Sequence, residues 1–246
     1  MNFRALAVPV LASVLTLAGA GCHDAPGKPV AGSEAVRPDQ LLEFEPLYAQ
    51  NCASCHGQHG KNGAALSLAN PIYLAVAGVA NIQRVTAEGV SGTMMPPFAK
   101  TKGGMLTDQQ VAALAQGMVK EWGQPVLPVG QALPAYASSS AGNAEKGQKA
   151  YAAFCARCHG ADGTGAVVGN LHVGSFVDPA YLSLISDQGL RSIIIAGQAE
   201  QGMPDWRSDA VGKSARPLSD EEIADIVAWI ATHRIATPGQ PYPQKP

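Results

Sequence analysis

The chain has 246 residues, of which 46% are hydrophobic and only 15% are charged, and its formal net charge is −2. A chain of this length has room for two small domains, and so weak a charge argues against a protein that binds nucleic acid. The 27 glycines and 18 prolines are typical of short helices joined by long loops.

The N-terminus carries a predicted targeting signal over residues 1–21. An apolar run at 5–17 is too short for an ordinary membrane span and is followed by small residues up to Cys22. These small residues suit an ordinary signal peptidase. They also resemble a bacterial lipoprotein cleavage site, although Gly19 stands where such sites usually carry a larger aliphatic residue. Lipidation would account for Cys22, the odd one of five cysteines, so we prefer a lipid-anchored mature form to a soluble one.

Composition divides the rest of the chain into two domains with connecting segments. Residues 22–38 are rich in glycine, proline and alanine and predict a flexible tether. A second segment rich in proline and serine, 124–140, suits neither helix nor strand and predicts a linker. The domains are therefore expected at 39–123 and 141–236, and an extended tail is expected at 237–246.

The pentapeptide Cys-x-x-Cys-His occurs twice, at 52–56 and at 155–159. This pattern is the attachment signature of c-type haem. Cysteines at i and i+3 lie on one helical turn, so both thiols can bond the two vinyl groups of one haem while the following histidine binds the iron. The predicted sites are two covalent haem c groups, with Cys52, Cys55, Cys155 and Cys158 as attachment residues and His56 and His159 as iron ligands.

Two other readings of a Cys-x-x-Cys pair are a thioredoxin-like redox site and half of a zinc site. A thioredoxin-like pair should follow a strand in a βαβ pattern, and none is visible in the sequence. A zinc site would need Cys55 and His56, or Cys158 and His159, to converge on one tetrahedral ion, which immediate sequence neighbours do poorly.

The two halves of the chain repeat one another. A tyrosine precedes each pentapeptide, an Asn-Pro or Asp-Pro pair follows it, then a Met-Pro pair, and then a Leu-Thr-Asp or Leu-Ser-Asp sequence. The spacing between matching positions increases along the chain, which predicts two loop insertions in the second half. The matched positions are Tyr48 and Tyr151, Asn70 and Asp178, Met95 and Met203, and Thr107 and Ser219.

The expected elements of each half are helices. A first helix runs into the pentapeptide, and a short middle helix starts at the Asn-Pro or Asp-Pro pair, where the polar residue can cap it. A further helix is expected at 82–90 or 189–197, and a last helix follows Thr107 or Ser219. No convincing strand is visible, so the predicted fold class is all-α.

The whole pattern resembles class I c-type cytochromes, with two tandem domains in which a few helices wrap around a covalent haem. In that family the first and last helices cross closely, commonly with a glycine against an aromatic side chain. The resemblance places Gly147 and Trp229 at this crossing in the second half. In the first half it places Phe44 and Gly117 there, with the large and small partners exchanged.

The resemblance also implies a methionine sulfur as the second iron ligand in each half. Met203, which precedes a proline, is the candidate in the second half; in the first half Met94 and Met95 compete, and Met95 is preferred because it aligns with Met203. His59 and His172 lie in loops near the pentapeptides and could give His/His ligation, although a role without iron binding is preferred for both. Each proximal histidine is expected to donate its other ring N–H to a backbone carbonyl in the following loop.

A departure from the family pattern concerns this carbonyl. The second half has Gly169-Asn170-Leu171 where the family often has Pro-Asn-Leu, and the first half has Ala64-Ala65-Leu66 at this place. Arg84 and Arg191 occupy similar places in the two halves and could either pair with haem propionates or lie on the surface.

These features predict an electron-transfer protein and not an enzyme. The chain is expected to be a di-haem cytochrome on the periplasmic side of the bacterial cytoplasmic membrane. It is expected to pass electrons between a redox donor and a redox acceptor, as a tethered carrier or as a subunit of a respiratory or dehydrogenase complex. One alternative is a di-haem peroxidase-like enzyme, which needs one open haem site. Another is a non-haem thiol or metal protein.

Overall fold

The computed structural model describes residues 36–124, 132–207 and 216–236. The predicted signal peptide, Cys22 and the C-terminal tail lie outside these ranges, as does most of the predicted tether. The chain divides into a unit at Met1–Gln40, of which the short 3-10 helix η1 (Pro38–Gln40) is described, and a unit at Leu41–Pro246. Within the described ranges, no helix combines the length and the apolar character needed to cross a membrane.

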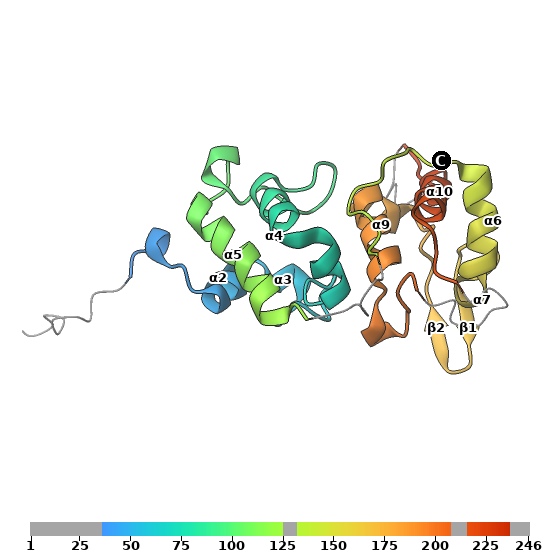
Figure 1. The fold of residues 1–246 in the computed structure, drawn as a ribbon, viewed down its shortest axis with the longest axis horizontal. Helices are drawn as coiled ribbons and strands as arrows, with labels where there is room; N and C mark the ends of the chain where they lie inside the picture. Colours follow the sequence, from blue (N-terminus) through green and yellow to red (C-terminus); the bar gives the residue numbers. More distant parts are fainter. Residues whose placement is uncertain (1–35, 125–131, 208–215, 237–246) are drawn as a thin grey trace, which may run out of the picture. The chain divides into compact units, whose positions relative to one another are not determined.

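The first half is helical, as the sequence predicts (Figure 1). Its elements are α2 (Phe44–Asn51), α3 (Ala53–His56), α4 (Pro71–Glu88), η2 (Lys100–Lys102) and α5 (Asp108–Trp122). The two middle helices expected here are one element, α4, interrupted at Gly78, whose φ of 63° and ψ of 165° are not helical. Glycine adopts this backbone conformation without the steric penalty of a Cβ atom.

The second half contains the same helices and a short hairpin. Its elements are α6 (Ala144–Phe154), α7 (Ala156–His159), β1 (Ala166–Val168), β2 (Leu171–Val173), α8 (Pro179–Leu184), α9 (Asp187–Ala196), η3 (Ala199–Gln201) and α10 (Asp220–Ala231). The strands pair antiparallel, with Val168 opposite Leu171. The expectation of no strand was therefore wrong at this point, because three-residue strands are too short to show an alternating pattern. The hairpin lies within the first of the two predicted insertions.

Side-chain caps fix the start of the helices that follow each pentapeptide. The Asn70 carboxamide oxygen accepts hydrogen bonds from the backbone N–H groups of Ile72 and Tyr73, at 2.9 and 3.2 Å. Asp178 caps α8 in the same way. Thr107 and Ser219 each form a complete capping box with the residue three positions later, so the predicted starts of α5 and α10 are confirmed.

The first and last helices of the second half pack closely, and α6 and α10 lie side by side in Figure 1. A Cβ atom on Gly147 would lie 1.9 Å from the carbonyl oxygen of Asp225, so the glycine meets the backbone of α10. The close crossing at Gly147 is confirmed, but its nearest neighbour is this backbone and not the predicted Trp229. The Trp229 ring packs instead against Tyr151, with ring centroids 4.3 Å apart.

The corresponding crossing in the first half brings α2 and α5 together. A Cβ atom on Gly117 would lie 2.3 Å from a ring carbon of Phe44, so the predicted glycine–aromatic contact is confirmed. The Trp122 ring packs against two neighbouring rings, at centroid distances of 5.0 Å from Phe44 and 4.9 Å from Tyr48. The aromatic cluster leaves no room for a side chain at position 117.

We expect Gly117→Ala to destabilise the protein, because the added methyl group must displace the Phe44 ring. Overpacking of this kind costs about 1–3 kcal/mol of stability. Replacing glycine by alanine in a helix gains roughly 1 kcal/mol in helix propensity, so a cost in the upper part of that range leaves a net loss. Chemical denaturation of the holoprotein measures the change in the free energy of unfolding.

The matched control repeats the substitution in a Phe44→Ala background, where the clashing ring is absent. There Gly117→Ala should be neutral or stabilising. An equal loss of stability in both backgrounds would show that the ring does not set the size of residue 117.

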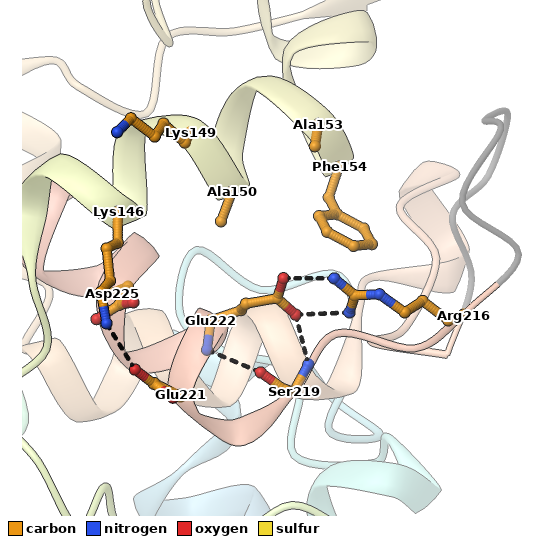
Figure 2. A pocket seen from close by; sticks show the side chains of 10 residues that line it. All are labelled: Lys146, Lys149, Ala150, Ala153, Phe154, Arg216, Ser219, Glu221, Glu222 and Asp225. Carbon is orange, nitrogen blue, oxygen red and sulfur yellow. Dashed lines mark hydrogen bonds and ion pairs between the residues drawn. The ribbon is translucent and has the colours of Figure 1, made fainter.

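The N-terminus of α10 carries an ion pair that joins it to the preceding segment (Figure 2). The Arg216 guanidinium donates to both carboxylate oxygens of Glu222, at 2.7 and 2.6 Å, and lies over the Phe154 ring at 5.1 Å. The hydrogen bonds from Arg216, together with the Ser219 cap, lower the pKa of Glu222 to about 2. Folding therefore stabilises the ionised carboxylate.

We expect this carboxylate to contribute to acid stability. Because its pKa is depressed in the folded state, its contribution is present above the unfolded value of 4.5 and is lost as the pH falls toward about 2. Solvent screening of the partly exposed pair limits the effect to about 1 kcal/mol. The free energy of unfolding of Glu222→Gln should therefore fall less than that of the unaltered protein between pH 4.5 and 2.

The neighbouring Glu221 serves as the comparison, because its ion pair with Lys146, at 3.0 Å, has 70% side-chain exposure on the carboxylate side. Glu221→Gln should keep the acid dependence of the unaltered protein. The interpretation fails if both variants lose the same amount of acid dependence.

Candidate functional site

The two pentapeptides have the same backbone conformation. Cys52 ends α2 and begins α3 with φ −120° and ψ −33°, and Cys155 joins α6 to α7 with φ −119° and ψ −35°. The Cys52 carbonyl accepts from the N–H groups of Cys55 and His56, at 3.2 and 3.1 Å, and the Cys155 carbonyl makes the equivalent bonds at 3.1 Å. Each pentapeptide is thus a single helical turn, set at an angle to the helix before it, that carries both cysteines and the histidine.

A tyrosine–glycine hydrogen bond closes each turn. The Tyr48 hydroxyl donates to the Gly57 carbonyl at 2.8 Å, and the Tyr151 hydroxyl donates to the Gly160 carbonyl. Both glycines have left-handed backbones, with φ of 83° and 81°. The sequence analysis identified both tyrosines only as matched positions of the repeat and did not predict this bond. The glycine that follows both pentapeptides was the available signal.

The four cysteines of the pentapeptides carry free thiols. Burial is the main cause that raises the pKa values of Cys52 and Cys155 to about 12. Reactive cysteines of thiol–disulfide oxidoreductases have lowered pKa values, so this setting does not resemble a redox-active dithiol. Cys55, in contrast, is exposed, and one buried and one accessible thiol on the same turn fit attachment to a group lying along it.

The two histidines of the pentapeptides lie in different surroundings. His56 is buried, and its Nδ1 atom lies 2.7 Å from the Leu66 carbonyl oxygen, which leaves Nε2 as the nitrogen available to a metal. Burial lowers the pKa of both His56 and His159, which favours the neutral form that metal binding needs. The predicted carbonyl partner is confirmed for His56. For His159 the prediction was wrong, because its buried Nδ1 has no partner among the described residues.

The two Met-Pro segments are held by equivalent hydrogen bonds. Each folds back over a left-handed glycine that ends the preceding helix, Gly89 after α4 and Gly197 after α9. The Val90 N–H donates to the Met95 carbonyl at 3.0 Å, and at the matched positions the Gln198 N–H donates to the Met203 carbonyl at 2.9 Å. The structure therefore places Met95 and Met203 at equivalent positions.

Exposure separates the competing methionines of the first half. The Met94 side chain is 77% exposed, whereas Met95 is half-buried, as is Met203. A ligand to a group enclosed by the helices needs a side chain directed inward. Exposure therefore favours Met95.

The other candidate side chains either lie at the surface or form hydrogen bonds within the protein. His59 and His172 are exposed, the latter in β2. Arg84 lies at the surface, with its guanidinium 3.7 Å from the Glu88 carboxylate. Arg191 is instead 3% exposed and donates to the carbonyls of Ala135 and Tyr136 and to the Asp220 carboxylate. Its remaining nitrogen, Nη1, is buried and has no partner in the part of the chain that the structure describes.

Comparison with protein families assigns both halves. A model of cytochrome c matches residues 144–234, and a model of cytochrome c oxidase, cbb3-type, subunit III matches residues 39–116. The chain is a c-type cytochrome. Cytochrome c domains carry covalently bound haem c, and two such domains with two Cys-x-x-Cys-His motifs fit two haems.

One relative is the cbb3-type cytochrome c oxidase subunit FixP of Sinorhizobium medicae (strain WSM419), which is 29% identical over 151 residues. The match covers 54% of this chain and 45% of the relative, so the cytochrome spans less than half the length of FixP.

Two solved structures resemble parts of the fold. The KustC0563 c-type cytochrome matches 33% of this chain and 99% of its own, with 27% identity and a TM-score of 0.29. The Kuenenia stuttgartiensis reducing HAO-like protein complex Kustc0457/Kustc0458 matches 82% of this chain and 98% of its own, with 18% identity and a TM-score of 0.41.

The residues of this cytochrome fit haem c. Each pentapeptide offers two unpaired thiols and one histidine on a single turn, and the His56 Nδ1 contact leaves the opposite ring nitrogen for iron. These are the donors that covalent attachment and axial ligation require.

Proposed function

We propose that the cytochrome holds two haems, each between a histidine and a methionine, in domains at 39–123 and 141–236. The pairs are His56 with Met95 and His159 with Met203, and the thioether bonds are made by Cys52, Cys55, Cys155 and Cys158. The observation that carries this proposal is the equivalence of the two halves, in which matching backbone hydrogen bonds hold both the pentapeptide turn and the Met-Pro segment.

Haem c supplies a one-electron iron couple when bound. His56 with Met95, and His159 with Met203, would hold the two irons, and iron held by both side chains would leave no position for substrate. The soft thioether sulfur favours ferrous iron and raises the reduction potential above that of two histidine ligands. The chain is thereby suited to pass electrons between two other redox proteins rather than to catalyse bond chemistry itself.

We further propose that the cytochrome works outside the cytoplasmic membrane, tethered through a lipid on Cys22, as a carrier or a subunit of a redox complex. The apolar run at 5–17 and the small residues before Cys22 support secretion and lipidation. The similarity of the first half to subunit III of cbb3-type oxidases, and the 29% identity to FixP over 54% of this chain, support a place beside a respiratory oxidase. Contacts with the electron donor and acceptor are expected to be small and transient.

Removal of either methionine should open one haem. Met95→Ala and Met203→Ala are each expected to abolish about half of the methionine–iron absorption of the oxidised holoprotein, because each side chain supplies one of two sulfur ligands. Near-infrared spectroscopy measures this absorption directly.

The matched control is Met94→Ala, which changes the exposed neighbour of Met95 and should leave the spectrum intact. Retention of the full absorption in Met95→Ala or in Met203→Ala would contradict the ligand assignment. A high-spin ferric haem in the unaltered protein would instead favour the peroxidase-like alternative.

The tether can be tested independently of the haems. Expression of the full chain in a bacterium that matures c-type cytochromes should place the cytochrome in the membrane fraction. Cys22→Ser removes the thiol that lipid attachment needs, so this variant should move to the soluble periplasmic fraction or stay uncleaved.

Fractionation followed by mass measurement of the mature N-terminus checks this prediction. A Cys22→Ser variant with the same membrane association and the same mature start as the unaltered protein would contradict lipid anchoring.

A further inference from the structure

The two proximal histidines differ in the hydrogen bonding of Nδ1, the ring nitrogen that does not bind iron. In the first half His56 Nδ1 lies 2.7 Å from the Leu66 carbonyl oxygen. In the second half His159 Nδ1 is buried, and none of the described residues, which include the whole segment 160–207, offers it a hydrogen-bond partner. The same turn therefore presents iron with two different imidazoles.

The loop after each pentapeptide explains this difference. In the first half Ala65 N–H donates to the Cys55 carbonyl at 2.9 Å, and this bond turns the chain so that the next carbonyl, that of Leu66, reaches the His56 ring. In the second half the corresponding hydrogen bond closes a shorter loop, because the Gly165 N–H donates to the His159 carbonyl at 3.0 Å. The chain then enters the hairpin β1–β2.

The hairpin leaves an apolar neighbour beside His159. The Phe176 ring packs edge-on against the imidazole, with centroids 5.1 Å apart and an interplanar angle of 76°. This contact restrains the imidazole ring, as the carbonyl does in the first half, but it accepts no hydrogen bond. The inserted hairpin has therefore replaced a polar restraint with an apolar one.

A hydrogen bond from Nδ1–H to a carbonyl raises the basicity of the imidazole and makes Nε2 a stronger donor to iron. A stronger donor favours ferric iron, which carries the larger positive charge, and so lowers the reduction potential of the site. We propose that the second haem site has the higher reduction potential, so that electrons enter the cytochrome at its first half and leave from its second. This inference rests on the proposed electron relay.

One difference opposes this order, because His56 is more buried than His159 and burial disfavours ferric iron. The hydrogen bond, however, changes the electron density of the imidazole ring that binds iron, whereas burial changes only the surroundings of that ring. The ligand difference should therefore decide which site is reduced first.

Potentiometric titration of the full-length holoprotein tests the order, and two matched variants assign it. In Met95→Ala the unperturbed wave belongs to the second site, and in Met203→Ala it belongs to the first. The equilibrium constant for moving one electron from the first site to the second should be about tenfold or more in favour of the second, which corresponds to 59 mV for a one-electron couple. Equal potentials, or the reverse order, would overturn the proposal.

The ligand difference itself is read by resonance Raman spectroscopy of the same variants. Carbon monoxide is bound to the opened site and removed by a laser flash, so that histidine is the only axial ligand at the moment of measurement. The iron–histidine stretching frequency should be higher in Met95→Ala, where His56 is hydrogen-bonded, than in Met203→Ala. Equal frequencies would overturn the stated cause.

Failure of this inference differs from failure of the proposed function. Two low-spin haems with potentials in the reverse order would preserve the relay and reverse its direction. A high-spin haem in the unaltered protein would instead reject the relay, whichever site has the higher potential.

Discussion

The structure depends on one constraint, which is that two cysteines and a histidine must share a single helical turn. Cys52 and Cys155 make this possible by leaving the path of the preceding helix with nearly the same dihedral angles. A left-handed glycine ends each turn, and its carbonyl is fixed by a buried tyrosine hydroxyl. The position of that tyrosine is set in turn by the closing helix, through Trp122 in the first half and Trp229 in the second.

The two halves share this skeleton but differ in the segment that follows the pentapeptide, where only the second half has a hairpin. The backbone bonds that hold the Met-Pro segments are matched, as are the capping boxes at Thr107 and Ser219. The segment next to the proximal histidine is not matched, because a hairpin in the second half stands where the first half supplies a carbonyl. Two sites built on one plan can therefore differ in reduction potential, which is what a directional relay needs.

Sequence reasoning predicted the features that arise from local chemistry. The pentapeptides, the caps at Asn70 and Asp178, and the capping boxes each depend on a few neighbouring residues whose side chains satisfy exposed backbone groups. The contact of Phe44 with Gly117 was also predictable, because a repeat fixed the alignment of two helices.

The remaining features depend on tertiary packing that the sequence pattern does not specify. Gly147 was predicted to meet Trp229, but how far one helix slides along another decides which atoms it touches, and it meets the Asp225 backbone. The hairpin strands are only three residues long, which is too short to show an alternation of apolar and polar residues. Because that hairpin was not predicted, the absence of a hydrogen-bond partner for His159 Nδ1 among the described residues was not predicted either.

We propose that this cytochrome holds both irons between a histidine nitrogen and a methionine sulfur. Near-infrared magnetic circular dichroism of the oxidised, unaltered full-length protein tests it most directly, with the haem content of the same sample counted by the pyridine haemochrome method. Two haems per chain are expected, both low-spin and both with the methionine–iron band. A high-spin haem, or a bis-histidine spectrum at either site, would contradict it.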